Sequence, residues 1–256
     1  EPVIVTRYSA TEYSRIKEYP NMLRKHALVA AIVIAPTAAM AAEPSWDGAA
    51  ELGTIFTSGN TDTQSINANF MAKRTGEVWD TTLKLEALTS EEDGVKSKEK
   101  YSALTQFDRN FTEHSYMAIV AQQERARFSG YPYQSTVSVN YGYRVLKNDT
   151  MELNLEAGPG YRRDKLKESD EIQEEAIGRL ALSYDWQIRE GVSFIENFTA
   201  EIGSDNSIYK SETGLQSQLS GSLASKLTYK VKHVEEVPEG TENTDTEFGV
   251  TLVYSF

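Results

Sequence analysis

The feature that most constrains this chain is a two-residue alternation of apolar and polar side chains, which continues through most of its length. In one such run, Val137, Val139 and Tyr141 are apolar, while the residues between them, Ser138 and Asn140, are polar. Successive side chains of a β-strand point to opposite faces, so each run predicts a strand with one apolar and one hydrophilic face. Helical periods of useful length are absent from these runs. The sequence therefore predicts an all-β protein.

Turn-forming residues divide the alternating runs into about twelve expected strands. These span residues 47–58, 63–75, 78–90, 98–110, 115–128, 134–146, 151–165, 175–188, 191–202, 209–221, 224–236 and 246–256. Even-numbered strands are followed by tight links, and most odd-numbered strands by longer loops that carry charges, Gly or Pro. The longer loops are expected at residues 91–97, 129–133, 166–174, 203–208 and 237–245.

Short turns at one rim and long loops at the other are typical of bacterial transmembrane β-barrels, whose strand number is even. We therefore expect residues 42–256 to form a single antiparallel up-and-down transmembrane β-barrel of about 12 strands. A helical membrane protein is excluded, because no run reaches the ~18–20 apolar residues that a spanning helix requires.

The N-terminal region contains an expected export signal in residues 22–41. A basic segment that begins at Met22 is followed by nine apolar residues, 27–35, and then by small residues that end at Ala41. This order of basic, apolar and small-residue regions is that of a secretory signal peptide. We predict cleavage after Ala41, and we interpret residues 1–21 as an upstream extension or a gene-start artefact outside the folded domain.

Alternation alone leaves open which face is apolar in the folded barrel. Soluble barrels place the apolar set inward, and membrane barrels place it outward. Export, long strands and aromatic residues near strand ends favour the membrane barrel. Tyr254 and Phe256, in an alternating last strand that ends on an aromatic residue, resemble the assembly signal of outer-membrane proteins. The expected location is the cell outer membrane, with outer-membrane lipid, lipopolysaccharide and the barrel-assembly machinery as partners. The alternative is a soluble periplasmic β-barrel binding protein.

Composition bears on several function classes. With 26 Lys and Arg against 38 Asp and Glu, the net charge of −12 disfavours a nucleic-acid-binding surface. The chain contains no Cys, which excludes thiol catalysis and disulfides. Its three histidines, His26, His114 and His233, lack partners at metal-ligand spacing, and neither a serine nor a phosphate-binding glycine motif is present. We therefore expect no enzyme, no metal and no cofactor.

The hydrophilic face of the strands would line the lumen of a membrane barrel. By this parity the charged lumen residues are Lys84, Glu86, Arg144, Glu152, Glu156, Arg162, Lys226, Lys230 and Lys232. Charges of both signs suit a narrow diffusion channel for ions or small polar solutes. They equally suit a salt-bridged interior in a non-conducting structural or stress-response envelope protein. Twelve strands lie between filled eight-stranded barrels and open sixteen-stranded porins, so both alternatives remain.

A basic cluster of Arg162, Arg163, Lys165 and Lys167 precedes an acidic tract that begins at Glu168. Near the outer interface such a cluster is suited to lipopolysaccharide phosphates, which Arg and Lys bind by charge-assisted hydrogen bonds. The alternative is a solvated loop without a partner.

Two segments resemble a known family. Residues 46–53, Trp-Asp-Gly-Ala-Ala-Glu-Leu-Gly, lead into residues 57–63, Thr-Ser-Gly-Asn-Thr-Asp-Thr. This opening is similar to that of the YdiY-like, salt-induced outer-membrane proteins, and residues 245–256 resemble the close of the same family. The resemblance extends over the whole expected mature chain, and the Ser-Gly-Asn-Thr-Asp-Thr turn is its most specific part. It implies a Gram-negative outer-membrane β-barrel of unknown function, and it brings no catalytic residues.

Overall fold

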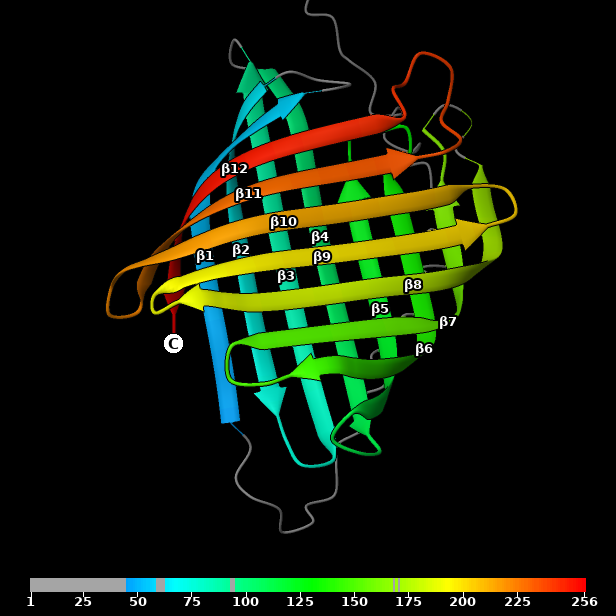
Figure 1. Ribbon diagram of the computed structural model, residues 1–256. Helices are drawn as coiled ribbons and strands as arrows, with labels where there is room; N and C mark the ends of the chain where they lie inside the picture. The colour runs from blue at the N-terminus through cyan, green and yellow to red at the C-terminus, as the bar shows by residue number, and fades with distance from the viewer. Residues whose placement is uncertain (1–44, 59–62, 93–94, 168, 170) are drawn as a thin grey trace, which may run out of the picture. The chain divides into compact units, whose positions relative to one another are not determined.

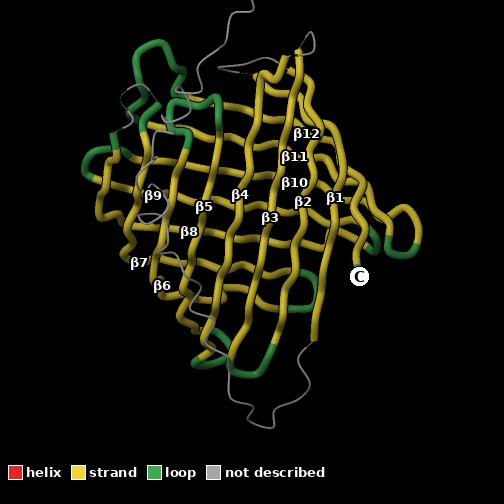
Figure 2. Tube along the Cα trace, turned by 180° about the vertical axis from the view of Figure 1, so that it is seen from behind, coloured by secondary structure: helices red, strands yellow, loops and turns green. Residues whose placement is uncertain are grey.

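The computed structural model describes residues 45–58, 63–92, 95–167, 169 and 171–256. These residues form a closed antiparallel barrel, which Figures 1 and 2 show from opposite sides. The strands are β1 (Ser45–Ser58), β2 (Thr63–Thr75), β3 (Trp79–Glu92), β4 (Val95–Asn110), β5 (Ser115–Ala126), β6 (Tyr133–Lys147), β7 (Met151–Lys165), β8 (Ile172–Arg189), β9 (Val192–Gly203), β10 (Ser207–Ser220), β11 (Leu223–Val234) and β12 (Thr244–Ser255). The expected signal peptide, the extension before it and residues 59–62 of the family-like turn lie outside the described residues and stay predictions.

The predicted fold class is confirmed. Each strand pairs with its neighbours along the chain, and β1 pairs with β12 to close an up-and-down barrel of twelve strands within the described residues. The same part of the chain contains no helix long and apolar enough to cross a membrane.

Two of the expected long loops are wrong, because the strands around them extend further than predicted. β3 continues to Glu92 and β4 begins at Val95, so most of 91–97 is strand. Likewise, β9 and β10 leave only residues 204–206 between them. Charged residues indicated a loop in the sequence, yet an inward-facing charge is stable in a strand when it has a partner across the barrel. Lys98 is an example, with its Nζ 2.7 Å from Glu247 Oε1 on β12.

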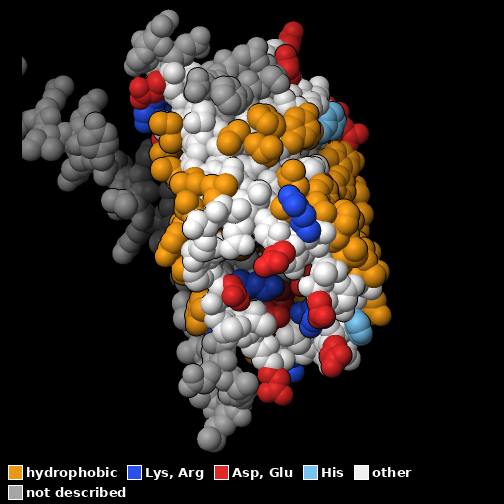
Figure 3. Space-filling model, turned by 60° about the vertical axis from the view of Figure 1, so that its left-hand side comes forward, with side chains coloured by type: hydrophobic (Ala, Val, Ile, Leu, Met, Phe, Trp, Pro, Cys, Tyr) orange, Lys and Arg blue, Asp and Glu red, His pale blue; other side chains and the backbone are white. Residues whose placement is uncertain are grey.

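The outward face of the barrel is apolar and the inward face is polar. On β6, the side chains of Val137 and Val139 are 51% and 47% exposed, whereas Ser138 and Asn140 between them are buried. Figure 3 shows broad hydrophobic patches on the outer wall, and charged side chains of both signs gathered in one region of the same view. An apolar outer wall around a polar interior is the arrangement of a membrane barrel. It is the reverse of what the soluble-barrel alternative requires.

The two rims differ as the sequence indicates. One rim carries the short links, including the two-residue turns at 190–191 and 221–222. Gly191 and Gly221 have φ angles of 73° and 51° there, a conformation that tight hairpin turns require and that Gly adopts without strain. The opposite rim carries the longer loops after β5, β7 and β11, which span residues 127–132, 166–171 and 235–243, as well as the short link 204–206 after β9.

Buried apolar side chains form two small clusters in the described part of the chain. One consists of Tyr116, Ala118 and Val120, with Leu104 packed against them, on β4 and β5. The other joins Tyr131, Ile208 and Val234 with Leu166 and Val237, near the loop rim. Most of the remaining interior is therefore filled by polar and charged side chains.

Candidate functional site in the barrel interior

Direct contacts between charged side chains join opposite walls of the barrel. Lys232 on β11 places its Nζ 2.8 Å from Glu124 Oε1 on β5 and 2.7 Å from Gln134 Oε1 on β6. Lys210 on β10 lies 3.8 Å from the same carboxylate. Strand β5 is six strands away from β11 in either direction around the barrel. The lumen is thus crossed along a diameter, and we call Lys210, Lys232, Glu124 and Gln134 the diameter bridge.

A second group of ion pairs lies between β1–β4 and β10–β12. Lys230 Nζ is 3.1 Å from Glu86 Oε1 and 3.5 Å from Glu212 Oε2. Lys226 Nζ is 3.4 Å from the second oxygen of the same Glu212 carboxylate. Together with the Lys226–Glu51 and Lys98–Glu247 pairs, at 3.1 and 2.7 Å, these residues form the central cluster: Glu51, Glu86, Lys98, Glu212, Lys226, Lys230 and Glu247.

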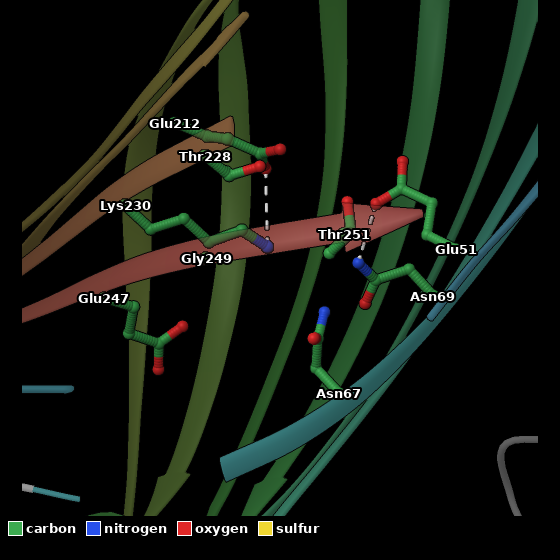
Figure 4. Close-up of a pocket in the computed structure, with 9 residues that line it drawn as sticks. All are labelled: Glu51, Asn67, Asn69, Glu212, Thr228, Lys230, Glu247, Gly249 and Thr251. Carbon is green, nitrogen blue, oxygen red and sulfur yellow. Dashed lines mark hydrogen bonds and ion pairs between the residues drawn. The ribbon is translucent and has the colours of Figure 1, made fainter. Parts of the chain in front are cut away.

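Two small cavities adjoin the central cluster, and both are lined by Asn67, Asn69, Lys230 and Glu247. Each has a volume of about 10 Å³, room for about one water molecule. Figure 4 shows Lys230 reaching from β11 toward the space that Asn67, Asn69 and Thr251 face. The side-chain oxygens of Asn67 and Thr251 are buried there without a hydrogen-bond partner among the described residues. Buried polar atoms are normally satisfied by protein, water or an ion, so these two oxygens indicate space for a small polar occupant.

Closer to the loop rim, Arg162 is completely buried among carboxylates. Its Nε lies 2.9 Å from Asp164 Oδ2, its Nη1 lies 3.6 Å from Glu201 Oε2, and its Nη2 pairs with Glu175. The same Nη2 donates a hydrogen bond of 2.7 Å to the Asn206 carbonyl oxygen. We call Arg162, Asp164, Glu175 and Glu201 the arginine cluster. A planar guanidinium with five donors is suited to hold several acceptors at once, and here it also fixes the loop after β9.

The Asn206 side chain joins three loops over this end of the barrel. Its Nδ2 donates to the Glu236 carbonyl at 2.8 Å and to the Tyr131 hydroxyl at 3.1 Å, while its Oδ1 accepts from Glu236 N at 2.9 Å. The Tyr131 hydroxyl in turn donates to the same Glu236 carbonyl at 2.9 Å. Burial raises the pKa of Tyr131, which keeps its phenol protonated and able to donate. We call Tyr131, Asn206 and Glu236 the loop clamp.

Near the turn rim, a further network connects β3, β5, β6, β7 and β8. Arg144 Nη2 lies 3.3 Å from Asp80 Oδ2, and its guanidinium carbon lies 4.6 Å from the centre of the Tyr116 ring. The Tyr116 hydroxyl donates to Glu156 at 3.1 Å, and the other oxygen of Glu156 lies 2.9 Å from Arg179 Nη1. These contacts fill the β3–β8 side of the interior next to the Tyr116 cluster.

The structure brings most of the predicted lumen residues into four of these five groups. They are Glu86, Lys226 and Lys230 in the central cluster, Lys232 in the diameter bridge, Arg162 in the arginine cluster, and Arg144 and Glu156 near the turn rim. Lys84 precedes the exposed Leu85 in β3 and so shares the inward face, while Glu152 accepts a hydrogen bond from Asn154 within β7. Their role in lining a conducting lumen stays a prediction.

Sequence reasoning missed most of the acidic partners of these lysines and arginines. Glu51, Glu124, Glu212 and Glu247 all have inward parity, so the signal was present in the sequence. Applying the two-residue period to every expected strand would have found them. What the period does not reveal is which inward residues meet.

The predicted basic cluster at residues 162–167 is divided by the barrel wall. Arg162 points inward and is buried, whereas Arg163 is exposed on the outer face with its Nε 3.2 Å from Glu174 Oε1. Consecutive residues of a strand face opposite sides, and β7 continues through Lys165. The expectation of one surface cluster is therefore wrong for Arg162.

The residues of the expected assembly signal lie at the seam where the barrel closes. Phe256 exchanges two backbone hydrogen bonds of 2.9 Å with Gly48, and its ring stacks on Phe70 and Tyr254 at centroid distances of 6.3 and 6.4 Å. A Cβ atom at Gly48 would overlap the Phe256 ring, so any other residue at this position would require the ring to move. The role of Tyr254 and Phe256 as a signal stays a prediction.

Two of the three histidines lie in the described part of the chain, at opposite rims. His114 Nδ1 is 3.1 Å from the Arg144 carbonyl oxygen in a turn, and His233 Nδ1 is 2.8 Å from Thr244 Oγ1 at the loop end of β11. Among the described residues, no group of three or more His, Asp or Glu side chains is arranged to hold a metal ion. That the protein is not an enzyme stays a prediction.

The chain forms a closed antiparallel barrel with an apolar outer wall, a charged interior, and longer loops at one rim than at the other. These features define the class of this protein, an outer-membrane β-barrel. Among solved structures, the chain is similar in fold to the NanC porin, with a TM-score of 0.55 and 9% identity over 80% of this chain and 98% of that one. It also matches the translocator domain of the autotransporter NalP from Neisseria meningitidis, with a TM-score of 0.49 and 10% identity over 82% and 88% of the two chains.

Sequence comparison places the chain more narrowly. Residues 50–256 match the family described as "Protein of unknown function, DUF481", and the chain belongs to this family. It is 26% identical to the "Uncharacterized protein YdiY" of Escherichia coli (strain K12) over 215 residues, which are 84% of each chain. The predicted membership of a YdiY-like family is confirmed.

Proposed function

We propose that this outer-membrane barrel is a narrow channel for ions or small polar solutes, closed in the present structure by lysine–glutamate bridges. The observation that carries the proposal is that the central ion pairs face the interior and still touch solvent. The side chain of Lys230 is 21% exposed, and those of Glu86 and Glu212 are 34% and 26% exposed. Even paired charges are costly to remove from water, so partly hydrated charges of both signs fit a water-containing path.

The bridging groups are also suited to move. Lysine has a flexible four-carbon stem, unlike the planar guanidinium of arginine, and it contributes the cations of the diameter bridge and of the central cluster. Where the interior is most completely buried, at the arginine cluster, the cation is arginine. A closed lumen that opens by rotation of lysine side chains is consistent with this division.

Conductance in planar lipid bilayers tests the proposal. We expect purified protein to give small conductance steps above the lipid baseline. The double variant Lys232→Ala, Glu124→Ala should give larger steps, because it removes the Lys232–Glu124 contact across the lumen and leaves only the more exposed Lys210 without its carboxylate. Lys147→Ala, at an exposed position on the turn rim, is the matched control. Absence of steps from both the natural protein and the double variant would refute the channel.

The second candidate is a non-conducting structural envelope protein, and the diameter bridge is the observation that favours it. Ion pairs between walls six strands apart oppose flattening or widening of the barrel. In this case the natural protein gives no steps, and the double variant unfolds at lower temperature without conducting.

Location in the cell outer membrane, with lipid, lipopolysaccharide and the barrel-assembly machinery as partners, is part of the same proposal. It is supported by the fold and by the apolar outer wall. A membrane barrel should migrate differently on gels before and after boiling and should fractionate with outer membranes. Recovery in the soluble periplasmic fraction without a migration shift would contradict it.

A further inference from the structure

We propose that the central cluster is a binding site for a small monovalent cation, and that the Lys230 ammonium takes the place of this cation in the closed barrel. The inference rests on the proposed channel function, since it names the class of ion that would pass. It begins with the surroundings of one ammonium group. Lys230 Nζ lies 3.1 Å from Glu86 Oε1 on β3 and 3.5 Å from Glu212 Oε2 on β10, so carboxylates from two walls converge on one positive charge.

A lysine ammonium is a compact point charge, and a potassium ion carries the same charge at a similar size. Oxygen atoms that surround the one are therefore suited to surround the other. Two carboxylates do not amount to a divalent metal site, in agreement with the absence of a metal-holding acidic group among the described residues. The site suits a singly charged ion that binds weakly enough to leave again, as conduction requires.

Neutral oxygens of residues that line the same cavity as Lys230 provide an independent indication of a ligand. Asn67 and Thr251 are 3% and 4% exposed, and Asn67 Oδ1 and Thr251 Oγ1 have no hydrogen-bond partner within the part of the chain that the structure describes. Both line the cavity into which Lys230 extends (Figure 4). Amide and hydroxyl oxygens are hard ligands of the kind that alkali cations accept. They would complete the coordination that two carboxylates begin.

The position of Lys230 also fits a point on a path. It lines both water-sized cavities, together with Asn67 and Glu247, so the two spaces meet at its side chain. The opposite part of the interior is filled by the Tyr116 cluster and the arginine cluster. An ion that crosses the barrel would therefore pass on the β1–β4 and β10–β12 side and would have to replace the Lys230 ammonium.

Substitution of Lys230 tests the site through stability and selectivity. Lys230→Met removes the ammonium and keeps the carboxylates, so the variant should unfold about 2–4 °C higher in potassium chloride than in choline chloride of equal concentration, because choline is too large for the site. The natural protein and Lys147→Met should show no such difference. In bilayers under a potassium chloride gradient, the reversal potential of Lys230→Met should shift toward cation selectivity.

If Lys230→Met fails to assemble, the variant Lys230→Gln keeps a polar side chain at this position together with Glu86, Glu212, Asn67 and Thr251, and serves for the same measurements. Equal unfolding temperatures in the two salts, for whichever variant assembles, would overturn the cation site. Failure of both variants to assemble would overturn it as well, because a cation that replaces the ammonium should rescue folding in potassium salt. A potassium-specific shift without any conductance would instead leave the site standing and refute the channel.

Discussion

Arg162 and Arg163 are adjacent in β7, and their side chains meet opposite environments. Arg162 is buried with Asp164, Glu175 and Glu201. In the Arg163–Glu174 pair, by contrast, the side chain of Arg163 is 55% exposed and that of Glu174 is 50% exposed. The cost of removing each charge should follow this difference, because a buried carboxylate that loses its partner cannot be compensated by water.

We predict that Arg162→Met lowers the free energy of unfolding by about 3–5 kcal/mol, since it leaves carboxylates buried without their cation. Arg163→Met should lower it by about 0–1 kcal/mol, as is usual for an exposed ion pair. Urea unfolding in detergent micelles, followed by tryptophan fluorescence, measures both. Similar losses for the two variants would contradict the inward placement of Arg162.

Individual residues also show what can and what cannot be predicted from the sequence. The two-residue period places Lys232 and Glu124 on the inward face of their strands, and it does so without any structure. It does not reveal that these residues meet, because their contact depends on how closely β5 and β11 approach across the closed barrel. The inward-facing residues could thus be predicted from the two-residue period, whereas the pairs that they form with one another could not.

Among the elements, the loops depart most from expectation. Charged residues around 91–97 predict a loop, yet β3 and β4 extend through them to within two residues of each other. In soluble proteins a charged stretch between strands usually marks a turn, whereas a barrel with a polar interior accommodates the inward half of such a stretch. The turn rim was easier to predict, because Gly191 and Gly221 meet a local requirement for positive φ.

The loop clamp gives the loops after β5, β9 and β11 a shared stability. We predict that Tyr131→Phe, which removes one hydroxyl from this network, makes local opening about 1 kcal/mol easier. Cleavage of the loop after β11 by a glutamate-specific protease should become about five times faster, because proteolysis follows the population of the open form. Glu235, Glu236, Glu239 and Glu242 provide cleavage sites in that loop.

Tyr133→Phe is the matched control for the clamp. Its side chain is 41% exposed at the start of β6, and its ring beside Arg125 is retained by phenylalanine. Equal cleavage rates for Tyr131→Phe and the natural protein would mean that the three loops do not open together.

At the scale of the whole molecule, the assignment of faces can be tested by depth. Val139 lies near the middle of β6 on the outer wall and is 47% exposed, while Val145 is on the same strand near the turn rim. We predict that Val139→Arg lowers the free energy of unfolding in lipid by about 2–4 kcal/mol and Val145→Arg by about 0–1 kcal/mol. Denaturant titration of the barrel refolded in lipid vesicles measures both. A cost that does not depend on depth would contradict a lipid-facing outer wall.

The small size of the two buried apolar clusters bears on how the barrel responds to temperature. Unfolding a soluble protein exposes much apolar surface to water, which raises the heat capacity by about 0.45 cal/K/mol per Å², while newly exposed polar surface lowers it by about 0.26. Here the surface enclosed by the wall is mostly polar, and the apolar surface faces the membrane. Thermal unfolding that leaves the chain in the membrane moves little apolar surface into water, so the positive contribution is largely missing and calorimetry should find a small heat-capacity change. The stability curve of this barrel would then be flat, with little loss of stability on cooling.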